Sequence, residues 1–423
     1  MATSSFWHSF ADMQAITRDG PLVLERGEGV HVWDTTGRRY VDAAAGLWNC
    51  NVGHGRTEIG EAVARQVGRL ASFSTFGDYS NPPAEELAER LAALAPFPAA
   101  RAFLTSGGSD SVDTAVKLVR RYWSALGQPE RRTVVSRESA YHGMHLGGTG
   151  LAGIEPNRAG YGELVPDTTR VPWDSAEALA KTIESLGEQH VAAFICEPVI
   201  GAGGILIPPP DYLAEVARIC RETGVLLVLD EVITGFGRVG EWFAAHRFGV
   251  EPDLVLCAKG ITSGYLPMGA VLAGERVSEP FYDGTVGLWR HGYTSSGHVA
   301  GSAAALANLD IIERERLIPR VRDAEVVLAE AFTPLAAHPL VGEVRTGTGL
   351  LTAVQLSTDA LARDPALPAA VVAALRAEGV LTRAIGQGAV QVSPAFVITD
   401  EQIRDLAAAF ATALDTALTA APA

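Results

Sequence analysis

Cysteine is scarce in this sequence, with 4 among 423 residues. The four cysteines form no CxxC pair and no spacing typical of a disulfide framework, so we expect no disulfides. The four are Cys50, Cys196, Cys220 and Cys257. Three of the four stand among apolar residues and are expected to behave as small buried hydrophobic side chains. We also expect no metal site.

Long hydrophobic runs and basic residues are also in short supply. No apolar run reaches membrane-spanning length, and residues 1–8 have neither the basic nor the apolar part of a signal peptide. These absences predict a cytoplasmic protein. Lys and Arg number 34 against 49 Asp and Glu, a formal net charge of −15. Because nucleic acids and anionic membranes attract basic surfaces, we expect neither as a partner.

The composition that is present favours a globular enzyme. Hydrophobic residues make up 48% of the chain and charged residues 20%, which is enough to bury a large core. Short apolar strand patterns alternate with helical patterns between residues 101 and 273, and this order predicts an α/β fold with a doubly wound, mostly parallel sheet. The expected strands are 101–104, 133–136, 191–196, 225–229, 253–257 and 269–273, and the expected helices are 58–70, 84–94, 111–126, 175–187, 211–223 and 299–313.

We expect three parts along the chain. Residues 56–314 form a large domain, residues 315–423 form a small α+β domain, and residues 1–55 join the small domain. Residues 150–172 are rich in Gly and Pro and are predicted to be a long loop near the site. Residues 418–423 are expected to fray.

Two of the expected strands are each followed by one ionisable residue. The run 225–229 ends at Asp230, and the run 253–257 leads to Lys259. Open α/β sheets bind ligands at the carboxyl ends of their strands. A lysine that can form a Schiff base and an acid that can pair with a pyridine nitrogen suit pyridoxal phosphate, PLP. Taken singly, such residues are more often a helix cap and a solvated lysine, so other segments must agree.

Three other segments fit the same interpretation. The turn 105–110 lies between a strand and a helix, where free backbone N–H groups can bind phosphate, although many such turns bind nothing. Tyr141-His142-Gly143 follows a strand and could place a ring over a flat cofactor, but a surface aromatic is the commoner outcome for this tripeptide. Trp48, in a glycine-broken loop, is either a pocket wall or ordinary packing.

With these segments in view, nearly the whole chain resembles the class III aminotransferases of PLP fold type I, the ω-transaminases. The motifs are Tyr141-His142-Gly143, Glu197-Pro198-Val199, the run from Asp230 to Arg238, Ala258-Lys259-Gly260, and the run from Gly292 to His298. Within that class the chain is most similar to β-alanine:pyruvate and amine:pyruvate transaminases. The segments that point there are Gly46-Leu47-Trp48, the run from Ser109 to Ala115, and Thr382-Arg383-Ala384.

The resemblance implies a large mostly parallel domain plus a small α+β domain, and a ping-pong transfer of an amino group. The donor would be an ω-amino acid or amine, the acceptor pyruvate or a related keto acid, and the cofactor would alternate between PLP and pyridoxamine phosphate. Each active site would be shared within a homodimer, with a tetramer as the alternative assembly. Small-molecule substrates would be the other partners.

The resemblance also implies roles for the cofactor residues. Lys259 would hold PLP as a Schiff base and move the substrate proton, and Asp230 would keep the pyridine nitrogen protonated. Tyr141 and Val232 would cover the two faces of the ring. The phosphate would be bound by Gly108 and Ser109, and by Thr294 of the neighbouring subunit; His142 and Glu197 complete the cofactor set. Gly107 stands where a serine is usual in the family, so phosphate affinity is expected to be lower.

Arg383 occupies the position of the family's mobile arginine, which would grip a substrate carboxylate. Relatives acting on γ-aminobutyrate or ornithine have an acidic residue where this chain has Ala202, which argues against those substrates. The implied pocket walls are Leu47, Trp48, Tyr141 and Phe76, the last from the partner subunit, and these suit an apolar or amphipathic amine.

Three alternatives stay beside this interpretation. A class III enzyme could instead carry out intramolecular amino transfer or racemisation. A non-catalytic PLP-binding regulator would need a basic DNA-binding module, which this acidic sequence lacks. A nicotinamide dehydrogenase would need a GxGxxG turn after its first strand, and none is present.

Overall fold

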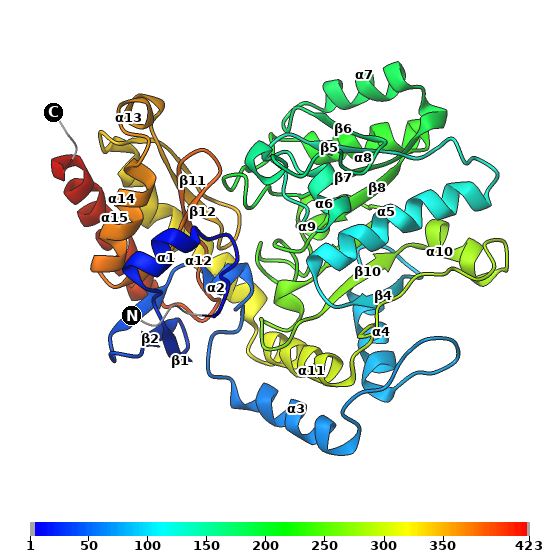
Figure 1. Cartoon of the computed structure of the whole chain (residues 1–423), viewed down its shortest axis with the longest axis horizontal. Helices are drawn as coiled ribbons and strands as arrows, with labels where there is room; N and C mark the ends of the chain where they lie inside the picture. Colours follow the sequence, from blue (N-terminus) through cyan, green and yellow to red (C-terminus); the bar gives the residue numbers. More distant parts are fainter. Residues whose placement is uncertain (1–4, 421–423) are drawn as a thin grey trace.

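A computed structural model describes residues 5–420 as two parts that lie side by side (Figure 1). The larger part is built on a seven-stranded sheet and the smaller on two four-stranded sheets. In Figure 1 the smaller part combines the blue N-terminal segment with the orange and red C-terminal segment. The chain therefore leaves the small part early and returns to it at the end.

The seven-stranded sheet has the order β4-β10-β9-β8-β7-β5-β6. Its strands, in that order, are Arg101–Thr105, Gly269–Ala273, Leu254–Cys257, Leu226–Asp230, Val191–Cys196, Thr133–Arg137 and Thr168–Val171. β10 is antiparallel to both of its neighbours, and β9, β8, β7, β5 and β6 pair in parallel. This confirms the predicted α/β class with a mostly parallel sheet.

Both faces of this sheet are covered by helices, as the continuous apolar strands predict. In β8, Leu226 and Val228 pack in one cluster with α5 (Gly108–Ala125). Leu227 and Leu229 point to the opposite face and share a cluster with side chains of α7 (Ala176–Leu186) and α8 (Tyr212–Thr223). Because alternate residues of a strand face opposite sides, one apolar run supplies both cores.

Other helices complete the large part. The helix expected at 84–94 is α4 (Pro82–Leu94), where the Asn81 side chain accepts a hydrogen bond from the Ala84 N–H and proline begins the helix. The remaining helices of this part are α3 (Thr57–Arg69), α6 (Leu146–Leu151), α9 (Ala244–Phe248), α10 (Glu275–Tyr282) and α11 (Val299–Arg314), with 3-10 turns η1 (Glu155–Asn157), η2 (Glu188–His190) and η3 (Lys259–Ile261).

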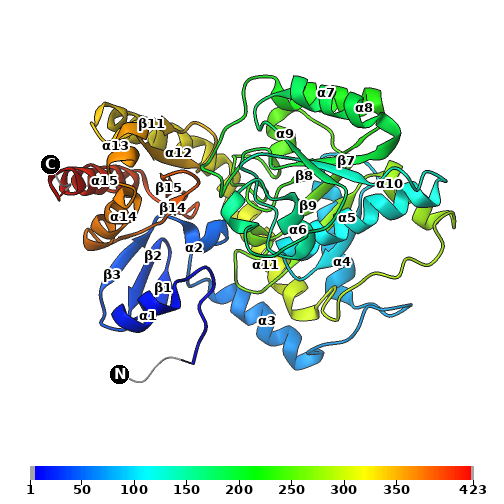
Figure 2. The ribbon, with the colours of Figure 1, turned by 45° about the horizontal axis from the view of Figure 1, so that its top comes forward.

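The small part joins the two ends of the chain in one sheet. β3 (Arg39–Asp42) pairs in parallel with β13 (Val380–Leu381), and Val380 lies opposite Val41. β1 (Leu24–Glu28) and β2 (His31–Asp34) extend this sheet, which Figure 2 shows in blue beside the orange strands. The second sheet contains β11 (Val341–Arg345), β12 (Thr352–Leu356), β15 (Ala389–Val392) and β14 (Ala384–Ile385).

Helices flank these sheets. They are α1 (Met13–Asp19), the single turn α2 (Ala45–Trp48), α12 (Leu317–Phe332), α13 (Thr358–Arg363), α14 (Leu367–Ala377) and α15 (Asp400–Ala420), with the 3-10 turn η4 (Thr333–Ala337). Within α2, Gly46 and Leu47 have non-helical backbone angles, in keeping with the irregular segment that the sequence predicts. No helix within residues 5–420 is long and apolar enough to cross a membrane.

Two expectations are corrected by the structure. Residues 150–172 are not one long loop, because β6 pairs in parallel with β5 and forms the edge of the large sheet. An edge strand with polar residues, here Thr168-Thr169-Arg170, carries no apolar run that could reveal it. The expected fraying is wrong for residues 418–420, which belong to α15; residues 421–423 lie outside the described residues.

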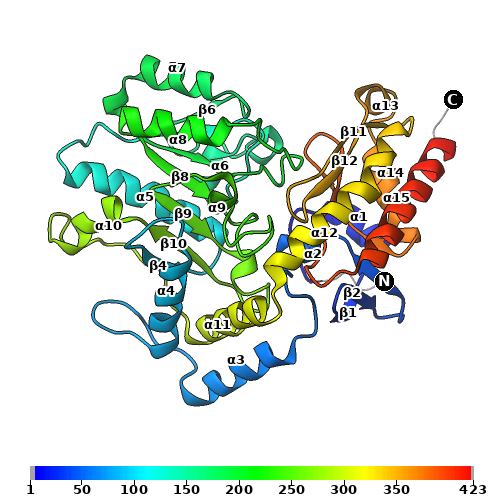
Figure 3. The same ribbon diagram turned by 180° about the vertical axis from the view of Figure 1, so that it is seen from behind.

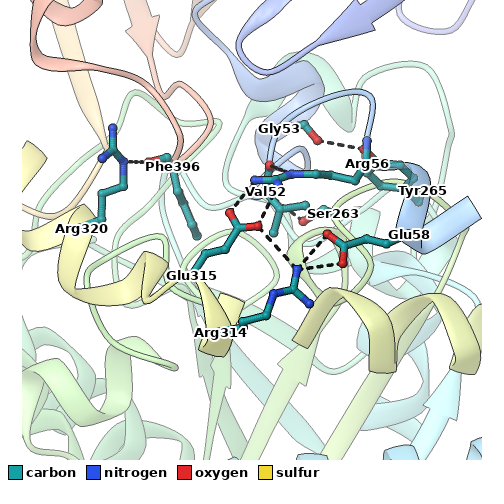
Figure 4. Close-up of polar contacts among 10 residues, drawn as sticks. All are labelled: Val52, Gly53, Arg56, Glu58, Ser263, Tyr265, Arg314, Glu315, Arg320 and Phe396. Carbon is teal, nitrogen blue, oxygen red and sulfur yellow. Dashed lines mark hydrogen bonds and ion pairs between the residues drawn. The ribbon is translucent and has the colours of Figure 1, made fainter. Parts of the chain in front are cut away.

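Polar contacts fix the place where the chain crosses between the two parts (Figure 4). The guanidinium of Arg56 makes two bonds of 2.8 Å to the carboxylate of Glu315, and its Nε donates to the Val52 carbonyl at 2.8 Å. The Arg56 N–H donates to the Tyr265 hydroxyl at 2.6 Å, which in turn donates to the Gly53 carbonyl at 3.0 Å. Arg56 therefore links the segment where the chain leaves the small part to the segment around Glu315 where it returns.

A second arginine near this crossing makes simpler contacts. Arg314 pairs with Glu58 through one nitrogen, at 2.8 and 2.9 Å, and both side chains are more exposed than those of Arg56 and Glu315. Beyond the crossing, α12 runs into the small part (Figure 3), where Arg320 Nε donates to the Phe396 carbonyl at 2.8 Å.

We predict that Arg56→Met destabilises the protein more than Arg314→Met does. Arg56→Met removes a bidentate, partly buried ion pair and a backbone contact, which should cost about 1–2 kcal/mol, whereas the exposed pair of Arg314 should cost under about 0.5 kcal/mol. Differential scanning calorimetry should therefore show a melting temperature about 1–2 °C below that of the parent protein for Arg56→Met, and a smaller shift for Arg314→Met. Equal melting temperatures for the two variants would contradict this.

Candidate active site

Asp230 and Lys259 lie together at the carboxyl edge of the large sheet. Asp230 is the last residue of β8 and pairs with Leu256 of β9, and Lys259 follows β9 by two residues. Both side chains line one cavity. Lys259 has a positive φ of 47°, a backbone conformation that a residue with a side chain adopts at a cost. Such conformations concentrate at functional sites.

The carboxylate of Asp230 is buried and oriented by two neighbours. Its Oδ2 lies 2.8 Å from Nδ1 of His142, and its Oδ1 accepts the N–H of Val232 at 3.1 Å. Only 4% of Asp230 and 1% of His142 are exposed. The other ring nitrogen of His142, Nε2, is buried and has no hydrogen-bond partner in the described part of the chain. The acid is therefore held in one orientation with little contact with water.

Burial lowers the pKa of the Lys259 amine to about 8, because the protonated form loses its hydration. The positive charges of Arg383 and Arg238 act in the same direction, while Asp230 and Glu197 oppose the shift. A lysine with this pKa is partly neutral near pH 7 to 8, and a neutral amine can act as a nucleophile and as a base.

The carboxyl group of Glu197 ties two loops of the cavity together. Its Oε1 accepts the N–H of Tyr141 at 2.9 Å, and its Oε2 accepts the N–H of Gly201 at 2.9 Å. Burial raises the pKa of this carboxyl group. The nearby guanidinium of Arg137 donates to the Glu197 carbonyl oxygen. Tyr141 therefore lines the cavity on a loop whose backbone is anchored.

The N-terminus of α5 forms another wall of the cavity. A Cβ at Gly108 would lie 3.1 Å from Cγ1 of Val232, so only glycine allows this close approach without displacement. Ser109 Oγ accepts the N–H of Met144 at 3.2 Å. Gly143 has φ of +84°, and a Cβ there would lie 2.4 Å from Ser109 Oγ. The first turn of this 18-residue helix, whose N–H groups have no preceding helical carbonyl to bind, is thus tightly packed against the cavity, and such helix starts bind anions.

Trp48 and Arg383 are stacked beside this cavity. Trp48 is 3% exposed and its Nε1 donates to Ser393 Oγ at 3.1 Å. The guanidinium carbon of Arg383 lies 4.2 Å from the centre of the Trp48 ring, and Nζ of Lys259 lies 5.2 Å from it. Burial lowers the pKa of Arg383 to about 10, so the guanidinium stays charged at neutral pH. Trp48 is thus both packed and close to the site.

Most of the residues that the sequence singles out line the same cavity. They are Leu47, Gly108, Ser109, Tyr141, His142, Glu197, Asp230, Val232 and Lys259. Ala202 packs against the apolar cluster that contains Trp48, and its carbonyl accepts the N–H of Gly386, three residues after Arg383, at 3.0 Å. The open surroundings of Gly107 leave room for the side chain of the usual serine.

Phe76 and Thr294 do not line the cavity of this chain. Phe76 is 54% exposed, and Thr294 is exposed as well. They belong to neighbouring segments, because a Cβ at Gly292 would lie 2.9 Å from the Phe76 ring and Thr75 Oγ1 donates to the Ser296 carbonyl at 3.0 Å. Both residues therefore lie on one surface of the large part.

The structure adds residues that the sequence analysis missed. Val112, Gly143 and Ile233 also line the cavity. The sequence analysis began this helix at residue 111, whereas it begins at Gly108. With the correct start, Val112 lies four residues after Gly108 and so on the same helix face. Ile233 stands directly after Val232. Gln391, which contacts Arg383, gave no signal, because it lies in a short apolar strand.

A family model for class-III aminotransferases matches residues 14–414 of the chain. The chain belongs to this family. The aminotransferase is 37% identical to a putrescine–pyruvate aminotransferase of Pseudomonas aeruginosa over 421 residues, which covers 94% of this chain and 91% of that protein. It is 36% identical to a β-alanine–pyruvate aminotransferase of the same organism over 373 residues, covering 83% and 82% of the two chains.

Solved structures of transaminases superpose on the aminotransferase. A transaminase from the marine bacterium Virgibacillus matches with a TM-score of 0.94 at 35% identity, covering 98% of this chain and 97% of that one. An ω-transaminase from Pseudomonas jessenii in complex with pyridoxamine phosphate matches with a TM-score of 0.94 at 33% identity, covering 98% and 97%. The resemblance drawn from the sequence motifs is confirmed.

Class III aminotransferases use PLP, and the cavity fits that cofactor. A phosphate needs N–H donors, and the first turn of α5 supplies them. A pyridine nitrogen needs an acidic partner, which Asp230 can be, and an aldehyde needs an amine, which Lys259 supplies. The buried Nε2 of His142, which no described residue hydrogen-bonds, is the kind of polar atom that a bound ligand can satisfy.

We predict that the cofactor-free aminotransferase captures added PLP at a rate that rises with pH around a midpoint of about 8. Below that pH the Lys259 amine is protonated and cannot attack, and above it the amine is neutral. Stopped-flow absorbance of the lysine-bound cofactor measures the rate, with Lys259→Ala as the control that develops no such band. A midpoint near the ordinary lysine value of 10.5 would contradict the shift.

Proposed function

We propose that this aminotransferase moves an amino group from an ω-amino acid or amine to pyruvate or a related keto acid by a ping-pong mechanism. The observation that carries the proposal is the charged guanidinium of Arg383, partly buried beside the cavity, whose Nη2 is buried and has no hydrogen-bond partner within residues 5–420. A cation of this kind suits the carboxylate of a keto acid or amino acid. The two pyruvate-using relatives support the acceptor.

The residues of the cavity divide the chemistry between them. PLP, when bound, supplies an electron-withdrawing ring that stabilises negative charge on the substrate carbon. The Lys259 amine takes a proton from that carbon and returns it to a neighbouring atom, which its lowered pKa allows. Asp230, which His142 holds in place, would keep the pyridine nitrogen of the cofactor protonated. Tyr141 and Val232 give a flat ring apolar surfaces to pack against.

Binding of the other groups follows from the same walls. Gly108 and Ser109, with the first turn of α5, bind the phosphate, and Glu197 keeps the Tyr141 loop in place. Leu47 and Trp48 form the apolar wall of the substrate pocket. Ala202 places no negative charge beside the loop that carries Arg383. The guanidinium therefore remains available to a substrate carboxylate.

We also propose that the aminotransferase is a homodimer with shared active sites. The exposed surface that carries Phe76 and Thr294 supports this, because both residues are implied cofactor or substrate contacts that lie away from the cavity of their own chain. A C2 dimer would bring such a surface to the partner's cavity. A tetramer would pair two such dimers.

The division of the chain and its location remain proposals as well. We propose a large domain of residues 56–314 and a small domain of residues 315–423 that residues 1–55 join; the pairing of β3 with β13 supports this boundary. A cytoplasmic location is supported by the four cysteines, which are all unpaired and buried, as is usual in a reducing compartment.

We predict that Arg383→Ala weakens the use of pyruvate far more than the use of an uncharged amine. Loss of a bidentate, charge-assisted contact should raise the KM for pyruvate by roughly 10- to 100-fold, while the KM for 1-phenylethylamine should change by less than about threefold. Steady-state kinetics with each substrate varied in turn measures both constants. An equal rise in the KM for pyruvate and for 1-phenylethylamine would show that Arg383 has only a structural role.

A further inference from the structure

Arg383 is held by a neutral amide instead of a carboxylate. Its Nε donates to Oε1 of Gln391 at 3.0 Å, and Gln391 is fully buried in β15. Within residues 5–420 the guanidinium takes part in no ion pair. The nearby carboxylate of Asp42 is already engaged, since it accepts the Gly46 N–H at 2.6 Å and lies 2.9 Å from His54 Nε2.

Gln391 is joined to the Arg383 segment by its backbone as well as by its side chain. The N–H of Gln391 donates to the Arg383 carbonyl at 3.2 Å, and its own carbonyl accepts the hydroxyl of Thr382. The guanidinium also lies over the Trp48 ring, whose Nε1 donates to Ser393 Oγ. Because the amide and the ring constrain the guanidinium together, its plane has a defined orientation beside the cavity.

Two buried hydrogen-bond donors of this pair have no acceptor among residues 5–420. They are Nη2 of Arg383 and Nε2 of Gln391. The Arg383 guanidinium and the Gln391 amide are joined by the hydrogen bond from Nε to Oε1. The two unused donors, one on each group, therefore belong to neighbouring groups. Buried donors are normally satisfied, and two of them beside a net positive charge suit an anion with two oxygens. Arg383 also lies close enough to the cavity residue Tyr141 for its charge to oppose the rise in the Tyr141 pKa that burial causes.

We infer that Gln391 is a positioning residue that sets the affinity of the aminotransferase for carboxylate substrates. Its amide oxygen orients Arg383 without neutralising it, which leaves the positive charge for the carboxylate of the keto acid. A carboxylate at the same position would pair with Arg383 and compete with the substrate. This inference rests on the proposed function, since it concerns the carboxylate acceptor of that reaction.

The test compares Gln391→Glu with Gln391→Met. Gln391→Glu adds a competing negative charge and should raise the KM for pyruvate by about tenfold or more, whereas Gln391→Met removes the acceptor and should raise it by roughly threefold. Neither variant should change the KM for 1-phenylethylamine by more than about twofold. If either variant weakens both substrates equally, or weakens neither, the inference is wrong.

A matched control is present on the neighbouring strand. Gln355 of β12 accepts a hydrogen bond from Arg345 Nη2 at 2.9 Å, and it does not line the cavity. Gln355→Glu adds the same charge beside an arginine in the same sheet. We expect this variant to leave the KM for pyruvate within about twofold of the parent value. A tenfold rise in this control would show that the charge acts at long range and not through Arg383.

A double-mutant cycle shows whether Gln391 acts through Arg383. In the Arg383→Ala background, Gln391→Glu should have no further effect on the KM for pyruvate, because its partner is gone. If the KM for pyruvate rises further in the double variant, by the factor that Gln391→Glu causes alone, the inference is wrong.

Calorimetric titration of the cofactor-loaded protein with propionate, a carboxylate that cannot react, gives a readout besides turnover. Its dissociation constant should rise about tenfold in Gln391→Glu and stay unchanged in Gln355→Glu. If the parent protein turns over no pyruvate, the proposed function fails. If the parent binds propionate and Gln391→Glu binds it equally well, only the inference about Gln391 fails.

Discussion

The partial removal from water of an acid and an amine at the ends of adjacent strands is the constraint on which the rest of the site depends. The Asp230 carboxylate is buried and the Lys259 amine is partly buried, so each needs neighbours that fix its position and protonation. His142 and the Val232 N–H hold the acid, and the sheet sets its distance from the lysine. The surrounding loops form the walls of the cavity that contains Asp230 and Lys259.

The two-part architecture completes the site from distant segments of the chain. The large part provides the sheet edge, the first turn of α5 and the Tyr141 loop, whereas the small part provides Trp48 and Arg383. The ion pair between Arg56 and Glu315 links the two segments that connect the parts. The large part would therefore bind most of the cofactor, and Arg383 of the small part would bind the substrate carboxylate.

The sequence predicted the pair Asp230 and Lys259 because a continuous apolar run marks a buried parallel strand and its end marks the ligand edge. The edge strand β6 was missed because it is polar, and the early start of α5 was missed because its first residues are glycine and serine. Gln391 could not be found in this way. Its importance depends on a contact with Arg383 across the sheet, which no local pattern in the sequence encodes.

Transfer of amino groups from an amine to a keto acid in this cavity can be followed by the absorbance of the PLP-loaded protein. The absorbance is recorded after addition of β-alanine, or separately of 1-phenylethylamine, and again after addition of pyruvate. We expect at least one amine to bleach the band of the lysine-bound cofactor and pyruvate to restore it. A band that neither amine bleaches, or that pyruvate fails to restore, would show that the cavity does not carry out this transfer.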